Sequence, residues 1–156
     1  VIDYSSPVER ELKHVRHYTN IEQVRFEDIN IEYDLQCTDF VLPALTVQPL
    51  VENSIKHGLM GLEEGGNLKI STYETEDDYW VSVEDDGIGF DEAILYDNDV
   101  KRHLGIKNIQ GRLEVMCNGT LTIETEKGKG TKAVIQLPKK DNRKKEYQDE
   151  SISSRR

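Results

Sequence analysis

Hydrophobic residues recur every three or four positions in three segments of the chain, and this spacing predicts three helices. The segments are residues 6–26, 43–58 and 105–117. Ser6 followed by Pro7 is typical of a helix N-terminus. The expected buried stripe of the first helix consists of Val8, Leu12, Val15, Ile21 and Val24. That of the third consists of Ile106, Ile109, Leu113 and Met116.

Hydrophobic and polar residues alternate in the segments between these helices, and a period of two predicts strands. One strand is "INIEYDLQ", with Ile29, Ile31, Tyr33 and Leu35 facing inward. Residues 68–75 and 79–86 form a hairpin across "EDD", and residues 119–126 and 130–138 form a second one across "KGKG". Because most strands arrive as hairpins, the helices share one face of the sheet. The predicted fold is α+β, a two-layer sandwich with a mixed sheet and helices on one face.

Composition is compatible with a single soluble domain that has a heavily charged surface. The chain has 156 residues, of which 36% are hydrophobic and 32% are charged, and this length suits one core. The formal net charge of −10 argues against general affinity for nucleic acid or for anionic membranes. Residues 139–156 have almost no apolar side chains, so we expect a disordered charged tail there.

The start of the chain and its cysteines add two further expectations. Val1 stands where an initiator Met would be, so we expect the sequence to be a fragment of a longer protein. No apolar run approaches the roughly 20 residues that cross a bilayer, so a membrane anchor would lie outside it. Cys37 and Cys117 lack CxxC spacing, which favours buried apolar roles over a zinc site or a disulfide.

The segment "VSVEDDGIGF" ends a predicted strand in acidic residues and continues into two glycines. Gly87 and Gly89 permit close approach of the backbone to a ligand, and Asp85 beside them can accept a hydrogen bond from an exocyclic amine. Taken alone, the segment is equally compatible with a simple turn. Glu92 occupies the third glycine position of a dinucleotide-binding fingerprint, and the chain contains no P-loop motif.

Two further glycine-bearing segments follow. In "RHLGIKNIQGRL", Gly105 opens a helix whose free N–H groups can bind an anion, although a solvated basic surface is the alternative for this segment alone. In "EKGKGTKAVIQLP", a glycine turn leads Thr131 into a strand, which by itself is an ordinary hairpin.

The helix "QPLVENSIKHG" places polar groups among apolar ones. Asn53, Lys56 and His57 fall at i, i+3 and i+4, so they share a face of an α-helix. The Asn53 side chain offers a neutral oxygen to a hard cation such as Mg²⁺, and Lys56 offers charge to a phosphate. A helix end with a solvated polar stripe explains this segment alone. It does not explain why three glycine-marked segments of matching chemistry follow in order.

Together the four segments resemble the ATP-binding catalytic domain of sensor histidine kinases, within the gyrase–chaperone–kinase–MutL ATPase superfamily. "QPLVENSIKHG" is similar to the N box of that family, and "DDGIGF", "HLGIKNIQGRL" and "GKGT" are similar to its three glycine boxes. "ELKHVRHYTNIEQVRF" and "LPALTVQPLVEN" are similar to the LytS-type subclass. The resemblance covers about residues 8–138 and implies a Bergerat-type ATP-binding fold.

The resemblance implies that the N box holds Mg²⁺ and the phosphates of ATP. Asn53 would ligate Mg²⁺ through its side-chain oxygen, with Glu52 beside it in the acidic N-box position. Lys56 would contact phosphate oxygens, and His57 would pack near the ribose or the base. These roles make Asn53, Glu52 and Lys56 the expected catalytic residues.

The first and third glycine boxes would hold the base. Asp85 would bind the adenine amino group, with Gly87 and Gly89 shaping its surroundings. Thr131 would assist through water.

The second glycine box would close over the phosphates. Residues 91–103 would form a mobile lid, and Gly105 with Asn108 would contact the phosphate groups. His103 departs from the family pattern, because a glycine is usual at its position, and this leaves lid geometry and phosphate contacts near His103 open.

The family resemblance also implies a division of the chain and a set of partners. Residues 1–26 would be a helix leading from a missing dimerisation region, residues 27–138 the ATP-binding catalytic domain, and residues 139–156 the tail. The phosphoacceptor histidine of the family lies before Val1, and we expect His14 and His17 to be solvated residues of a helix face. Partners would be ATP, the histidine-bearing dimerisation domain and a response regulator. The parent would be a homodimeric bacterial sensor in the inner membrane, with this domain in the cytoplasm.

Two other functions compete with a histidine kinase. ATP hydrolases of the gyrase or MutL kind place a water-activating Glu one turn before the N-box Asn, and Pro49 holds that position here. A non-catalytic nucleotide-binding regulatory or scaffold domain is the second alternative, and His103 is the feature that favours it.

Overall fold

The computed structural model describes residues 6–142, and a five-stranded sheet is the frame on which their other elements pack. The strand order is β1-β2-β3-β5-β4. β1 runs parallel to β2, and the other neighbouring strands are antiparallel, so the sheet is mixed, as predicted. The strands are β1 (Ile29–Leu35), β2 (Gly66–Glu74), β3 (Asp78–Asp85), β4 (Thr120–Glu126) and β5 (Gly130–Pro138).

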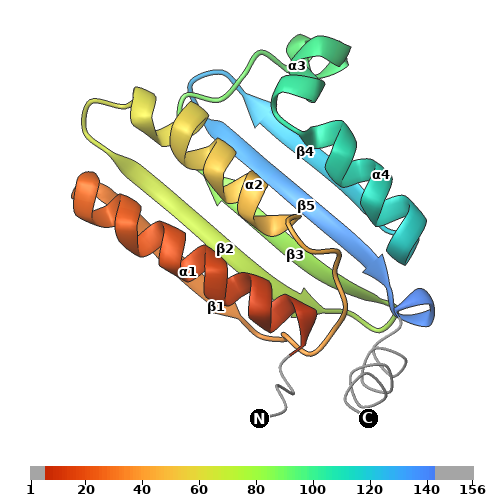
Figure 1. Ribbon diagram of the computed structural model, residues 1–156. Coiled ribbons are helices and arrows are strands. Elements are labelled where there is room, and N and C mark those ends of the chain that lie inside the picture. The colour runs from red at the N-terminus through yellow and green to blue at the C-terminus, as the bar shows by residue number, and fades with distance from the viewer. Residues whose placement is uncertain (1–5, 143–156) are drawn as a thin grey trace.

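Three helices lie across the same face of this sheet (Figure 1). They are α1 (Pro7–Arg25), α2 (Val47–Asn53) and α4 (Ile106–Cys117). One apolar core fills the space between the two layers and includes buried residues of all three helices. The two-layer α+β sandwich with both predicted hairpins is therefore confirmed.

The first half of α1 is buried as predicted, but the second half is not. Val8, Leu12 and Val15 lie in the core, whereas Ile21 and Val24 are 61% and 79% exposed. The expected apolar stripe is wrong for these two residues, because the C-terminal half of α1 packs through polar groups. Thr19 and Glu22 are buried instead, and the Thr19 hydroxyl lies 2.7 Å from the Tyr33 hydroxyl on β1.

The buried face of the third predicted helix also differs from the prediction near its C-terminus. Ile106, Ile109 and Leu113 of α4 are buried, but Met116 is 55% exposed and Cys117 takes its place in the core. The prediction for Met116 is therefore wrong. The reason is geometric: Cys117 lies four residues after Leu113 and continues its face of the helix. Neither Cys37 nor Cys117 is part of a disulfide; Cys117 is buried and Cys37 is half-buried.

The segment between β3 and α4 contains more helix than its weak periodicity indicates. Residues Glu92–Tyr96 form the 3-10 helix η3, and Asn98–His103 form α3. Side chains cap both: Asp91 accepts a hydrogen bond from the N–H of Ala93, and Asp97 from that of Asp99. These two caps explain how a polar segment forms helical turns.

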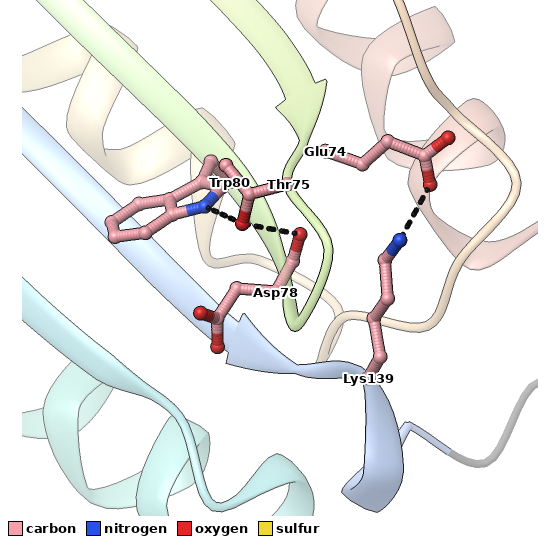
Figure 2. Close-up of polar contacts among 5 residues, drawn as sticks. All are labelled: Glu74, Thr75, Asp78, Trp80 and Lys139. Carbon is pink, nitrogen blue, oxygen red and sulfur yellow. Dashed lines mark hydrogen bonds and ion pairs between the residues drawn. The ribbon is translucent and has the colours of Figure 1, made fainter.

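The chain remains anchored beyond β5, where we expected a disordered tail from residue 139 onward. Residues Lys139–Asp141 form the 3-10 helix η4, and Figure 2 shows Lys139 reaching Glu74 at 3.2 Å beside the β2–β3 turn. The Asn142 side chain forms two hydrogen bonds with the backbone of Val41. Its oxygen accepts one from the Val41 N–H and its nitrogen donates one to the Val41 carbonyl, both at 2.9 Å. The rest of the predicted tail lies outside the described residues.

Candidate functional site

A side chain of the N-box helix forms a hydrogen bond with a backbone group that is distant in sequence. α2 begins at Val47, four residues after Pro43, and continues into a π-helical turn, η1 (Ser54–Gly58). The 3-10 helix η2 (Leu59–Gly61) follows directly, so the prediction that the helical segment ends at Gly58 is three residues short. The Asn53 side-chain nitrogen donates a hydrogen bond of 2.8 Å to the carbonyl of Leu104. Because the nitrogen is engaged there, the Asn53 side-chain oxygen is the atom that could ligate a cation.

The N-terminus of α4 lies directly beside this contact. Gly105, the residue after Leu104, has φ +73° and precedes the helix with no side-chain cap. A Cβ added at Gly105 would meet no atom within 4 Å. The first N–H groups of α4 thus have no side-chain cap and begin one residue after the carbonyl that Asn53 contacts, and an uncapped helix N-terminus is a feature that can bind anions.

Asp85 is a buried carboxylate at the end of β3. It is 4% exposed and accepts a hydrogen bond of 2.9 Å from the N–H of Gly87. Burial raises the pKa of Asp85 above its ordinary 3.8, and the nearby charge of Asp86 adds to this, while hydrogen bonds from Gly87, Ser54 and Thr131 oppose it. Since Ser54 follows Asn53, the carboxylate lies within one helical turn of the N-box amide.

The glycines around Asp85 allow backbones to touch one another. A Cβ added at Gly58 would lie 2.8 Å from Asp85 Oδ1, and one added at Gly87 would lie 2.5 Å from the Gly58 carbonyl. Gly89 and Gly130 both have positive φ, and their added Cβ atoms would lie 2.1 Å from the Glu126 carbonyl and 2.0 Å from the Asp85 carbonyl. The N box, the first glycine box and the third thus meet at Asp85 in contacts that admit no side chain.

The other predicted site residues differ in how exposed their side chains are. His57 is half-buried, whereas Lys56 is exposed, and both lie in the π-helical turn. The α-helical spacing used to group them with Asn53 does not describe a π turn. Asn108 is exposed in the first turn of α4. Thr131 pairs with Asp85 across β5 and β3, and its hydroxyl lies 2.9 Å from that of Thr125.

Glu52 lies toward α1 rather than toward α4. Its carboxylate accepts a hydrogen bond of 3.2 Å from the Gln48 side chain. Burial raises the pKa of Tyr18 on α1 to about 12, and the negative charges of Glu22 and Glu52 contribute to that shift. The structure thus brings Asn53, Asp85 and Gly105 together, while Glu52 is turned to a different side of α2.

Sequence reasoning missed three parts of this site. Ser54 hydrogen-bonds Asp85, Gly58 packs against the same carboxylate, and the Leu104 carbonyl receives Asn53. Gly58 carried a signal, since a glycine ends the motif, but a backbone carbonyl has no sequence signature. His103 is placed in α3, but its side chain lies outside what the structure describes.

The donor set fits Mg·ATP. An amide oxygen at Asn53, an uncapped helix N-terminus and the exposed Lys56 match a metal-bound phosphate chain, and the buried Asp85 matches an amine. Among residues 6–142 there is no group of three or more His, Cys, Asp or Glu side chains that could hold a metal ion.

Comparison with known proteins identifies the family. Residues 38–141 match the model of the family described as histidine kinase-, DNA gyrase B-, and HSP90-like ATPases. The chain belongs to this family. The match contains the N box and all three glycine boxes, so the domain is an ATP-binding domain of this type.

Named relatives come from several bacteria. The chain is 33% identical to the Bacillus subtilis protein YwpD over 92% of its own length and 55% of that protein. It is 32% identical to the sensor histidine kinase YesM of Bacillus subtilis, covering 84% of the chain and 23% of YesM. It is 39% identical to the sensor protein LytS of Oceanobacillus iheyensis, covering 57% of the chain and 16% of LytS. The chain therefore spans only part of each relative.

Solved structures share the fold. The blue-light activated histidine kinase of Erythrobacter litoralis EL346 superposes with a TM-score of 0.65 at 21% identity, over 85% of this chain and 42% of that one. The catalytic domain of the histidine kinase ThkA gives a TM-score of 0.62 at 18% identity, over 83% of this chain and 95% of that one. Among residues 6–142 no helix has the length and apolarity needed to cross a membrane.

Proposed function

We propose that this family member is the catalytic domain of a two-component sensor histidine kinase, which transfers the γ-phosphoryl group of ATP to a histidine elsewhere in its parent protein. The observation that carries the proposal is the hydrogen bond from Asn53 to the Leu104 carbonyl. It places the N-box amide against the uncapped N-terminus of α4, where phosphates and a metal ion would be held together. The relative YesM is named as a sensor histidine kinase, which supports the same reaction.

In the proposed complex each end of the nucleotide has its own set of residues. Asp85 would accept a hydrogen bond from the adenine amino group, in surroundings formed by Gly87, Gly89 and Thr131. His57 would pack near the ribose or the base. The phosphates would lie between the first turn of α4, with Gly105 and Asn108, and the side chain of Lys56.

Phosphoryl transfer needs mainly positioning and neutralisation of charge. Mg²⁺, ligated by Asn53, would neutralise part of the phosphate charge. The acceptor nitrogen of a neutral imidazole would bond to the γ-phosphorus as the bond to the bridging oxygen breaks, and ADP would leave. The imidazole is already basic near neutral pH, so Glu52 would have at most a supporting role. A response regulator would later receive the phosphoryl group.

Hydrolysis of ATP by water is disfavoured by one position. Pro49 lies in the first turn of α2, one turn before Asn53, where a hydrolase of the resembled kind needs a Glu to activate water.

We further propose that the parent is a homodimeric membrane-anchored bacterial sensor whose kinase domain lies in the cytoplasm.

The test is transfer of radioactive phosphate from ATP to the separately supplied histidine-bearing region of the parent protein. We expect labelling of that region and little release of free phosphate by the domain alone. Asn53→Ala and Asn53→Asp should each lower transfer at least about 100-fold, the scale of losing electrostatic stabilisation in a transition state. Asn30→Ala, which removes an amide from β1, is the matched control and should transfer normally.

Two results would overturn the proposal. Rapid phosphate release without an acceptor would make the domain a hydrolase. Tight nucleotide binding without transfer to any histidine would make it a regulatory or scaffold domain.

A further inference from the structure

Glu11 is a buried acid on α1 whose partners all belong to the start of the N-box helix. It is 6% exposed. Its Oε1 accepts hydrogen bonds from the backbone N–H groups of Thr46, Val47 and Gln48, at 2.7, 2.9 and 3.4 Å. Its Oε2 accepts the Thr46 hydroxyl at 3.3 Å. Every one of these partners is 35 or more residues away in sequence.

These bonds satisfy the backbone N–H groups at the start of α2, which have no partner within the helix. A helix N-terminus leaves four N–H groups without intrahelical partners. Thr46 provides no side-chain cap of its own, and the next residue after Gln48 is Pro49, which has no N–H. Glu11 therefore supplies the cap that the local sequence lacks, with its carboxyl oxygens at the positive end of the helix.

Arg112 holds the same loop from the opposite side. Its two terminal nitrogens donate to the carbonyls of Ala44 and Leu45. Arg112 belongs to α4, whose N-terminus meets Asn53 through the Leu104 carbonyl. The loop that starts the N-box helix is thus held by α1 through its N–H groups and by α4 through its carbonyls.

We propose that Glu11 is a positioning residue for nucleotide binding, which caps α2 from α1 and so holds Asn53 in place against the N-terminus of α4. The inference rests on the proposed function only in taking Mg·ATP as the ligand. Glu11 precedes residues 38–141, the part that matches the ATPase family. Asn53 lies about 10 Å along α2 from the cap at 1.5 Å per residue, and errors of 1 Å in such a site are costly.

The experiment measures binding of a non-hydrolysable ATP analogue with Mg²⁺ by calorimetry, using the whole chain. In Glu11→Ala we expect the Kd to rise about tenfold, equivalent to about 1.4 kcal/mol. Glu11→Gln, which keeps an acceptor oxygen, should restore most of the affinity. Leu12→Ala is the matched control: Leu12 is a buried neighbour on α1 that lowers stability when truncated but has no bond to α2, so its Kd should stay within about twofold of the wild type.

Hydrogen exchange without nucleotide gives an independent reading of the cap. The amides of residues 46–48 should exchange faster in Glu11→Ala than in the wild type or in Leu12→Ala. If Glu11→Ala does not fold, Glu11→Asp replaces it, because its carboxylate is one methylene too short and should show both effects.

The outcomes separate the two proposals. A folded Glu11→Ala or Glu11→Asp with wild-type Kd would overturn the positioning role. An equal rise of Kd in Leu12→Ala would do the same, because the effect would then follow from stability alone. A wild-type chain that binds no nucleotide would instead defeat the proposed function, while hydrogen exchange would still test whether Glu11 caps α2.

Discussion

Replacing Gly58 by alanine tests whether the N box and Asp85 form one packed unit. The backbone of Gly58, with φ −103° and ψ −66°, tolerates any residue, so strain in the main chain is not the issue. The added Cβ would lie 2.8 Å from Asp85 Oδ1, and ordinary contacts begin at 3.4 Å. Asp85 is buried and bonded to the Gly87 N–H, so its carboxylate can give way only by breaking a hydrogen bond or moving the strand end.

The size of the effect follows from these contacts. Overpacking of a buried site costs about 1–3 kcal/mol, and the gain from replacing glycine in a helix returns about 0.5–1 kcal/mol of it. At the middle of these ranges the net loss is about 1 kcal/mol, which should lower the Tm by about 2–8 °C in a domain of this size. If Asp85 binds the adenine amine as proposed, displacing it would also remove that hydrogen bond, and bonds to charged groups are worth about 1.5–3 kcal/mol. The Kd for ATP should therefore rise about 10- to 100-fold.

Thermal unfolding and calorimetric titration with Mg·ATP measure the two effects. Gly111→Ala is the matched control, because Gly111 lies in α4 and an added Cβ there meets nothing within 4 Å. That variant should be about 1 kcal/mol more stable and should bind ATP normally. A Gly58→Ala protein with the Tm and Kd of the wild type would refute the packing described here. A lowered Tm with unchanged Kd would remove Asp85 from the binding site.

Three further predictions follow from single contacts. Because burial raises the pKa of Asp85, its contribution to stability is complete below its ordinary pKa of 3.8 and is lost as the pH rises through the folded-state pKa. In urea unfolding, the stability of Asp85→Asn relative to the wild type should therefore grow between pH 4 and pH 8. A difference that stays constant with pH would contradict this. Asn142→Ala leaves both polar groups of the Val41 backbone without their partner, so we expect a loss of about 1–3 kcal/mol by thermal unfolding, whereas the exposed Lys140→Ala should change nothing. Leu45 has φ +59° and is 58% exposed. Leu45→Gly should therefore relieve about 1 kcal/mol of backbone strain and raise the Tm. A lowered Tm would show instead that the Leu45 side chain stabilises the fold.

Local patterns determined much of this protein. The periods of two and of three to four located the five strands and the helices α1, α2 and α4, because a side chain's face within one element depends only on its spacing along that element. The glycine-bearing segments were recognisable for a similar reason: positions that must lack a Cβ are visible in the sequence. The order of these segments was enough to predict the ATPase family.

Contacts between elements were decided by the tertiary structure alone. Ile21 and Val24 continue an apolar pattern, yet they are exposed because β1 offers the Tyr33 hydroxyl to that half of α1. Glu11 is buried on α1 beside Leu12, and its role depends on N–H groups of Thr46 and Val47 that no local pattern connects to it. The same holds for Asn53 and the Leu104 carbonyl, 51 residues apart. Spacing along the chain sets which way a side chain points, but only packing of the whole chain sets what it meets there.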